Sequence, residues 1–288
     1  MSQDQIAAKA TEGFEAEVKQ GERFQFGANW ARFLTTLNED KIKQAEQTLR
    51  EMLEVTDLQG KSFLDIGSGS GLFSLAARRL GARVHSLDYD PNSVGCTHEL
   101  RKRYFPEDPE WVVERASALD PVHMGSLGKF DVVYSWGVLH HTGSMWLGLE
   151  NAVLPTAPGS KLFIAIYNQQ GLKSRVWKIV KRTYCKSPQP IPFLIAILVL
   201  INTWWKQWVK DTLKGNPFRS WREYGKMRGM TPWYDILDWA GGYPFEVASS
   251  DELFNFYKKR GFTLTQLITN RGSGCNELVF VRGSEPKE

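Results

Sequence analysis

The segment Lys61–Gly71 reads Lys-Ser-Phe-Leu-Asp-Ile-Gly-Ser-Gly-Ser-Gly and decides the fold of this chain. Its first six residues are mostly apolar and predict a short buried strand. The alternating glycines predict a tight loop, and the residues from Leu72 to Leu80 have the pattern of a helix that stops at Gly81. A strand, a glycine loop and a helix in this order are typical of a doubly wound sheet that binds nucleotides at its strand ends.

Further strands and helices are predicted on both sides of this segment. Residues 42–53 carry apolar side chains at three- and four-residue steps, which predicts an amphipathic helix. The other strand-like segments are 82–87, 131–134, 161–167, 262–269 and 277–281, and a helix is predicted at 251–259. This alternation predicts a parallel sheet wrapped on both faces. We expect a core at 61–168 and 250–284, a helical cap at 1–60 and an insertion at 169–249.

Length and composition describe a globular protein. The chain has 288 residues, of which 42% are hydrophobic and 24% are charged, which excludes disordered, collagen-like and coiled-coil chains. Cys96, Cys185 and Cys275 lie far apart and predict neither a disulfide framework nor a zinc site. The start of the chain is polar and acidic, unlike a secretory signal. The longest apolar run, Phe193–Ile201, has nine residues, against the roughly 20 of a membrane-spanning helix. We therefore expect a cytoplasmic protein.

The net charge of +4 conceals an uneven distribution. Residues 169–228 contain thirteen lysines and arginines but only two acids, Asp211 and Glu223, for a local balance of +11. The rest of the chain has 23 basic and 30 acidic residues, a balance of −7. Five of the eleven tryptophans also fall in the basic stretch. This composition indicates an element with its own partner or surface.

Two acidic residues accompany the glycine loop. Asp65 lies two residues before Gly67, where its carboxylate is placed to meet an ammonium group directly or through water. Asp88 ends the next predicted strand, 21 residues after Gly67, where it is placed to accept hydrogen bonds from both hydroxyls of a ribose. Leu72 stands where the dinucleotide fingerprint GxGxxG requires glycine. A ligand with a ribose and a charged amine, but no pyrophosphate, suits these residues better than NAD.

These residues carry a family resemblance. The segments LDIGSGSG, HSLDYD and FDVVYSWGVLHH and the two predicted strands at the end resemble the class I S-adenosylmethionine-dependent methyltransferases. They are most similar to ubiquinone-biosynthesis-type small-molecule O-methyltransferases. The resemblance covers residues 61–168 and 250–281 but not the insertion. It implies an α/β, Rossmann-like, doubly wound and mostly parallel seven-stranded sheet with an antiparallel last strand, N-terminal helices and a helical insertion after strand 5.

The resemblance implies S-adenosylmethionine as the cofactor and assigns residues to it. The implied cofactor-binding residues are Asp65, Gly67, Gly69 and Gly71 at the methionine end, Asp88 at the ribose, Tyr89 at the adenine, Ser117, Ala118 and Leu119 along the adenine edge, and Ser135 in the fourth strand. Ser117 stands where the family frequently has aspartate. This departure weakens the assignment of the adenine edge and leaves the glycine loop unaffected.

A methyl acceptor that carries a proton needs a base beside the cofactor. His140 and His141 follow the fourth strand, and an unperturbed histidine suits base catalysis at neutral pH. His141 is the preferred base. The alternative for each histidine is that it orders the loop or caps the next helix. No third ligand at metal-site spacing accompanies the pair, so no metal is expected.

Two aromatic segments are candidate substrate-binding elements. Asn29 and Trp30 predict a lid over the cofactor, with packing of Trp30 in the core as the alternative. Tyr234, Asp235 and Trp239 predict a helix face that lines a substrate pocket, because aromatic rings with carboxylates commonly hold a sugar or polyol ring. The alternative for this second segment is a structured loop that packs the insertion against the core.

The insertion has three interpretations. It opens with basic residues at 173, 175, 178, 181 and 182 beside an apolar stripe of Leu172, Val176, Ile179 and Val180. It continues into the apolar run and a tryptophan cluster at 204–208. The segment is a helix buried against the core with solvated cations, a membrane-touching lid for a lipid-linked acceptor, or an RNA-binding surface. The uninterrupted apolar run disfavours RNA.

The sequence thus predicts a cytoplasmic S-adenosylmethionine-dependent methyltransferase. Its expected acceptor is a small molecule or a lipid-linked molecule, with oxygen as the preferred atom and peripheral contact with an anionic membrane at its inner face. The alternative is a tRNA or rRNA methyltransferase that binds RNA through the basic insertion. A third hypothesis is a catalytically idle partner subunit, which the intact loop and both acids disfavour.

Overall fold

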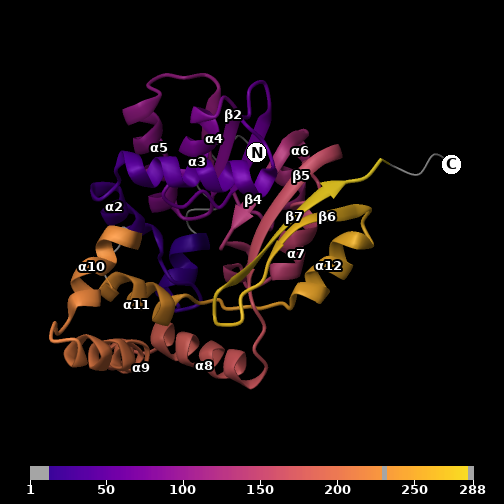
Figure 1. Ribbon diagram of the computed structural model, residues 1–288. Coiled ribbons are helices and arrows are strands. Elements are labelled where there is room, and N and C mark those ends of the chain that lie inside the picture. The colour runs from indigo at the N-terminus through magenta and orange to yellow at the C-terminus, as the bar shows by residue number, and fades with distance from the viewer. Residues whose placement is uncertain (1–12, 229–231, 285–288) are drawn as a thin grey trace.

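The computed structural model describes residues 13–228 and 232–284. It confirms the predicted seven-stranded α/β sheet (Figure 1). The strand order is β3-β2-β1-β4-β5-β7-β6, and the pairs are parallel except that β7 is antiparallel to both β5 and β6. The strands are β1 (Ser62–Ile66), β2 (Arg83–Asp88), β3 (Trp111–Arg115), β4 (Phe130–Trp136), β5 (Thr156–Tyr167), β6 (Phe262–Ile268) and β7 (Cys275–Arg282).

The sheet places its functional loops at one edge. The strand order reverses between β1 and β4, whose register pairs Leu64 with Val133. The carboxyl ends of parallel strands meet at the same edge of a sheet, and ligands bind there at the point of reversal. The loops that follow β1, β2, β4 and β5 therefore share this edge.

Helices cover both faces of the sheet. One face lies under α3 (Glu39–Leu53), α4 (Leu72–Arg79) and α5 (Pro91–Tyr104), and the other under α6 (Pro121–Ser126), α7 (Met145–Asn151) and α12 (Ser250–Lys258). Successive strand residues alternate between the two cores, with Phe63 and Val132 in the first and Leu64 and Val133 in the second. The predicted cap contributes α2 (Gly27–Thr35), which packs on α5, as well as α3. Residues 1–12 of that cap lie outside the described residues.

Four helices follow β5, where the insertion was predicted. They are α8 (Leu172–Lys186), α9 (Ile191–Leu213), α10 (Arg219–Arg228) and α11 (Pro232–Gly241). α11 packs against both α8 and α9, and α10 packs against α9 and α11. Figure 1 shows this group beyond the end of the sheet at which β5 ends, with α8 and α9 on the outside. The group is therefore placed to cover the edge that carries the functional loops.

The structure contradicts one of the three interpretations of the insertion, that of a helix buried against the core. The helix is not buried against the core, because only Ala196 and Val199 of the run Phe193–Ile201 are buried, while Leu194 and Leu198 are 54% and 66% exposed. The helix is longer than the nine-residue apolar run, because it continues through the tryptophan cluster and has 23 residues. By length and composition, α9 is the one helix among the described residues that is long and apolar enough to cross a membrane, and 22% of its apolar window is buried.

Candidate active site

The loop between β1 and α4 uses backbone conformations that favour glycine. Gly67, Gly69 and Gly71 have φ angles of +79°, +55° and +80°. A Cβ at Gly67 would lie 2.3 Å from the side chain of Val138, which leads into the 3₁₀ helix η1 (Leu139–His141). The loop therefore closes tightly against the segment after β4 and presents its backbone at the N-terminus of α4.

Asp65 and Asp88 flank this loop. Asp65 is 2% exposed and accepts a hydrogen bond from Ser74 Oγ at 2.5 Å. Burial raises the pKa of Asp65 to about 7. Asp88 accepts hydrogen bonds at 2.9 Å from the N–H groups of Gly69 and Asp90, and burial raises its pKa to about 6. A cationic ligand group would stabilise the charged form of both acids.

One cavity of about 930 Å³ connects the glycine loop with the helices after β5. Its volume is near the upper end of the roughly 300–1,000 Å³ of ligand pockets, which leaves room for two ligands side by side. We call one part the loop end, formed by Asp65, Gly67, Gly69, Asp88, Tyr89 and residues 117–119. We call the other part the aromatic end, formed by Tyr167, Trp177, Trp204, Tyr224, Asp235, Asp238 and Trp239.

Most of the predicted site residues meet in this cavity. Those that line it are Trp30, Asp65, Gly67, Gly69, Asp88, Tyr89, Ser117, Ala118, Leu119, His141, Asp235 and Trp239. Those that do not line it are Asn29, Gly71, Ser135, His140 and Tyr234. The structure thus brings together one set of residues from the N-terminal cap, from four loops of the sheet and from α11.

The predicted residues outside the lining have structural contacts. Ser135 is fully buried, and its hydroxyl donates to the Ile66 carbonyl at 3.0 Å. Tyr234 packs under the guanidinium of Arg32, 4.4 Å from its ring centroid. Gly71 is the N-cap of α4 and shapes the loop from behind.

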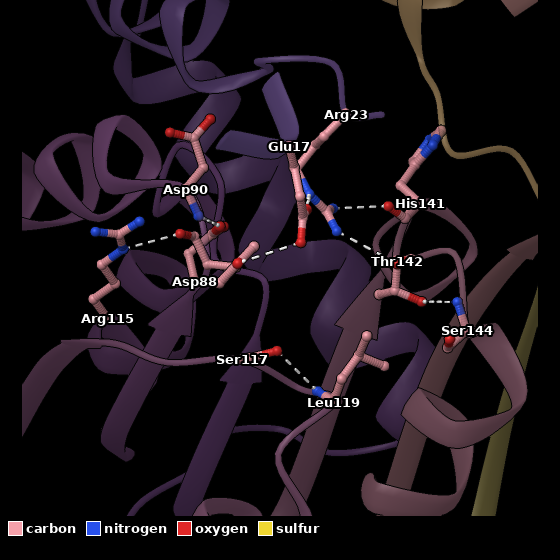
Figure 2. Close-up of polar contacts among 11 residues, drawn as sticks. Glu17, Arg23, Asp88, Asp90, Arg115, Ser117, Leu119, His141, Thr142 and Ser144 are labelled. Atoms are coloured by element: carbon pink, nitrogen blue, oxygen red, sulfur yellow. Dashed lines mark hydrogen bonds and ion pairs between the residues drawn. The ribbon is translucent and has the colours of Figure 1, made fainter. Parts of the chain in front are cut away.

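The adenine-side residues lie where β2 and β3 end (Figure 2). The N–H of Leu119 donates to Ser117 Oγ at 3.2 Å, which turns the chain after β3. Arg115 Nε donates to the Tyr89 carbonyl at 3.0 Å and ties the ends of the two strands together. Phe14 packs edge-on against the Tyr89 ring, with their centroids 5.4 Å apart. This corner is therefore an ordered pocket with an aromatic wall.

His141 faces the cavity from η1. Its Nδ1 lies 2.7 Å from the Pro244 carbonyl, an acceptor, so Nδ1 carries the proton and Nε2 does not. Burial and the charge of Lys181 lower the pKa of His141 to about 3. The imidazole is therefore neutral at physiological pH, and its surroundings make Nε2 a weaker proton acceptor than an ordinary histidine nitrogen.

His140 has a different position. It is fully buried, its ring centroid lies 4.0 Å from that of Tyr167, and burial lowers its pKa well below the usual range. Its backbone carbonyl accepts a hydrogen bond from the Glu246 N–H at 2.9 Å. This placement favours the alternative that His140 orders the loop. Across residues 13–228 and 232–284, no group of three or more His, Cys, Asp or Glu side chains is arranged to hold a metal ion.

The N-terminal segment lies over the loop end (Figure 2). Arg23 pairs with Glu17 at 2.5 Å and donates to the carbonyls of His141 and Thr142 at 3.0 and 3.4 Å. Trp30 lies against the glycine loop, since a Cβ at Gly69 would be 3.2 Å from its Nε1. Trp30 also packs against the hydrophobic core that contains Phe33 and Leu34, so its position fits both the lid and the core alternative.

Asn29 reaches away from the loop end. It is 7% exposed, and its Nδ2 donates to Asp238 Oδ1. The contact joins α2 to α11, so the N-terminal segment touches both ends of the cavity.

The aromatic end includes residues that the sequence analysis did not single out. The ring centroids of Tyr167 and Trp177 lie 5.6 and 5.2 Å from that of Trp239. Trp204 lies 5.3 Å from Tyr224, which donates to Asp235. Tyr167 had a usable signal, because it ends β5 at the functional edge. Trp177 and Trp204 could be noticed in the sequence only because the segment is rich in tryptophan.

Lys181 corrects a further prediction. It was expected on a cationic surface but is fully buried. Its Nζ donates to the Trp239 carbonyl and lies 4.1 Å from the centroid of the Trp239 ring. Burial lowers the pKa of Lys181 to about 7 and raises the pKa of Asp238 to about 7. Asp238 is part of the aromatic end, and Lys181 lies outside the cavity lining, against the ring of Trp239.

Comparisons with known proteins agree with this architecture. A family model described as a methyltransferase domain matches residues 37–267. The tRNA U34 carboxymethyltransferase of Ectopseudomonas mendocina is 41% identical over 90 residues, 31% of this chain and 26% of that protein. The ubiquinone biosynthesis O-methyltransferase of Xanthomonas oryzae pv. oryzae is 29% identical over 113 residues, 39% of this chain and 46% of that protein. The chain thus spans between about a quarter and a half of these curated relatives.

A solved structure shares the fold. The magnesium protoporphyrin IX methyltransferase of Synechocystis with bound SAH has a TM-score of 0.50 and 14% identity, with 84% of this chain and 83% of that chain covered. Its low identity makes it evidence for the fold alone. The family model, by contrast, covers most of the chain. The chain therefore belongs to the methyltransferase domain family.

Proposed function

We propose that this protein transfers a methyl group from S-adenosylmethionine, bound at the loop end, to an oxygen of a small or lipid-linked acceptor at the aromatic end. The observation that carries the proposal is the single cavity that joins the two ends. His141 lies between them, because η1 follows Val138 at the glycine loop on one side and His141 contacts Gly242 and Pro244 after α11 on the other.

The loop end fits the cofactor. Asp65 offers a buried carboxylate for the ammonium group of its methionine part. Asp88 uses one lone pair on each oxygen for backbone N–H groups and keeps others for ribose hydroxyls. Tyr89 and residues 117–119 offer a pocket for the adenine. When bound, S-adenosylmethionine supplies a methyl group on a positively charged sulfur.

The chain's own part in the reaction is alignment and proton removal. The Pro244 carbonyl holds the Nδ1 proton of His141, so Nε2 is the atom that accepts the proton of an acceptor hydroxyl. The ring of Phe26, with its centroid 4.9 Å from that of His141, packs against the imidazole and restricts its movement. The rings of the aromatic end exclude water and offer faces to a ring-bearing acceptor, while Asp235 and Asp238 offer hydrogen-bond acceptors.

Transfer to RNA is the alternative, and one observation favours it. Arg175, Lys178 and Arg182 are exposed on α8, close to the cavity-lining Lys173. The same helix also exposes Leu172 and Ile179, which phosphates would not cover favourably. RNA binding weakens steeply with salt, so an RNA methyltransferase would lose activity as salt rises, whereas a small-acceptor enzyme would keep it.

A labelling experiment separates these functions. The protein is incubated with ¹³C-methyl S-adenosylmethionine and an extract of the source cells, which is then partitioned between organic and aqueous phases. Label in the organic phase with the carbon chemical shift of a methoxy group supports a lipid-linked acceptor. Nuclease-resistant methoxy label in the aqueous phase supports a soluble one. Nuclease-sensitive label would establish the RNA alternative, and N-methyl or C-methyl label, or none, would contradict the proposal.

A further inference from the structure

We propose that α8 and α9 dock this protein flat on the surface of an anionic lipid bilayer. The surface concerned, the docking face, consists of Leu172, Val176 and Ile179 on α8 and Ile191, Leu194, Leu198, Ile201, Trp205, Val209 and Leu213 on α9. The inference rests on the proposed function in one respect: a lipid-linked acceptor would explain why the protein binds a membrane. The bilayer would then be the source of that acceptor.

The α9 part of the docking face is a continuous stripe. Its members recur at steps of three and four residues, which places them on one side of the helix, and they are between 41% and 83% exposed. Pro192, Ala196, Val199 and Asp211 are buried on the opposite side, where α9 meets its neighbours. Because that side contacts protein from the first turn to the last, only the stripe is available to lipid, and α9 lies in the plane of the bilayer surface.

α8 presents the same arrangement. Leu172, Val176 and Ile179 are 74%, 51% and 66% exposed, while Ser174 and Lys181 are the buried residues of the helix. A helix of a water-soluble domain normally buries its apolar side. Both helices pack on α11, and the exposure of their stripes shows that these sides do not face α11. Figure 1 shows α8 and α9 as the part of the molecule farthest from the sheet.

The basic residues around the docking face favour an anionic lipid surface as its partner. The exposed charged residues within 172–213, a stretch that the structure describes completely, are all basic: Lys173, Arg175, Lys178, Arg182, Lys186, Lys206 and Lys210. The single acid, Asp211, is 4% exposed and accepts a hydrogen bond from the Ser220 N–H at 2.8 Å. A second copy of the chain would bring like charges together, whereas anionic headgroups neutralise them and acyl chains cover the apolar stripe.

The cavity opens beside the docking face. Asn202 and Thr203 are exposed, line the cavity and stand between Ile201 and Trp205 of the stripe. On α8, Lys173 lines the cavity directly after Leu172. A molecule held in the bilayer by its lipid part can therefore reach the aromatic end without crossing open water.

Vesicle sedimentation with the full-length protein tests the proposal. We expect binding to vesicles of phosphatidylcholine and phosphatidylglycerol in equal parts, and binding about tenfold weaker to phosphatidylcholine alone or at high salt. The double variant Leu198→Ser/Ile201→Ser should lose about tenfold in affinity or more while it keeps its circular dichroism spectrum. Val122→Ser removes an 81% exposed apolar side chain from α6 and should bind like the wild type.

Other results would overturn the proposal. Wild-type protein that stays in the supernatant with anionic vesicles, or a double variant that binds normally, contradicts it. A dimer in sedimentation velocity that the double variant dissociates would assign the face to a second copy. Retention in membranes after an alkaline carbonate wash would assign α9 to a spanning helix. Because the assay contains no S-adenosylmethionine, it succeeds or fails independently of the proposed methyl transfer.

Discussion

The two ends of the cavity differ in what determines their shape: local backbone conformation at the loop end, and helix packing at the aromatic end. The loop end is made from segments that directly follow β1, β2 and β3, and its shape depends on local requirements such as the positive φ of Gly67 and Gly69. The aromatic end is assembled from Tyr167 at the end of β5 and from α8, α9, α10 and α11, which meet through side chains far apart in the sequence. A binding site for a common cofactor can therefore be fixed by local sequence, whereas a site for a particular acceptor depends on how helices pack.

The two ends also treat charge differently. At the loop end, the buried acids are supported by hydrogen bonds from backbone N–H groups or from Ser74. At the aromatic end, buried Lys181 donates to the Trp239 carbonyl while three apolar residues of the same helix face outward. The buried acids of the loop end therefore lie at a ligand site. The helices after β5 instead line the cavity on one side and expose apolar side chains on the other.

The largest expected effect lies where the two ends meet. Replacing His141 by glutamine should lower kcat by about a hundredfold or more, because the proposed base at Nε2 is lost. The affinity for S-adenosylmethionine should change little, since His141 is not among the residues assigned to that ligand. Turnover and cofactor titration measure the two quantities. His98→Gln, an exposed position on α5, is the matched control, and an unchanged kcat in His141→Gln would remove histidine from the mechanism.

The next effect tests the aromatic end through stability. The pKa of Lys181 is about 7 in the fold, against 10.5 ordinarily, because burial disfavours the charged form. Below pH 7 the buried ammonium group therefore lowers the free energy of unfolding. This destabilisation decreases as the pH rises from 7 toward 10.5, because the folded protein then holds the neutral amine. The free energy of unfolding should rise by about 2 kcal/mol from this residue between pH 7 and pH 9. Denaturant titration should show that the rise is absent in Lys181→Met, and an equal rise in both proteins would contradict the buried charge.

A smaller effect tests the loop end through pH. The pKa of Asp65 is raised from 3.8 to about 7 by burial, and only its ionised form attracts an ammonium group. Lowering the pH from 7.5 to 6 should therefore weaken the binding of S-adenosylmethionine by about tenfold. Asp65→Asn should bind more weakly at pH 7.5 and show a flatter dependence. Calorimetric titration measures the affinity for S-adenosylmethionine at both pH values. An affinity that stays constant or improves at pH 6 would show that the Asp65 carboxylate does not bind the ammonium group.

Much of the fold and of the loop end could be predicted from the sequence. The short apolar segment before the glycine run, the helical pattern after it and the next strand-like segment indicated β1, α4 and β2, since these patterns report local geometry. Strand β3 was not identified, because it is an edge strand whose Val112 is 45% exposed and whose second half, Glu114 and Arg115, is charged. The pattern of such a strand is weaker than that of a buried one.

The aromatic end resisted prediction for a physical reason. The sequence of α8 shows an amphipathic helix but not which side faces the protein, and the ordinary expectation put Lys181 outside and Ile179 inside. Packing on α11 produces the opposite result. The nine-residue apolar run of α9 had the same ambiguity, because a buried helix and one that faces lipid share a composition.

Measuring one variant from each end of the cavity tests most directly the proposal that the loop end binds the cofactor and the aromatic end binds the acceptor. Cofactor affinity and methyl transfer are measured on Asp88→Asn and Trp239→Leu with the same acceptor fraction. Asp88→Asn should lose about tenfold to a hundredfold in affinity for S-adenosylmethionine, as expected for hydrogen bonds to a charged group. Trp239→Leu should keep that affinity within about twofold and lose about tenfold in transfer. If Trp239→Leu lost cofactor affinity as severely as Asp88→Asn, or if Asp88→Asn bound like the wild type, the two ends would not be separate sites.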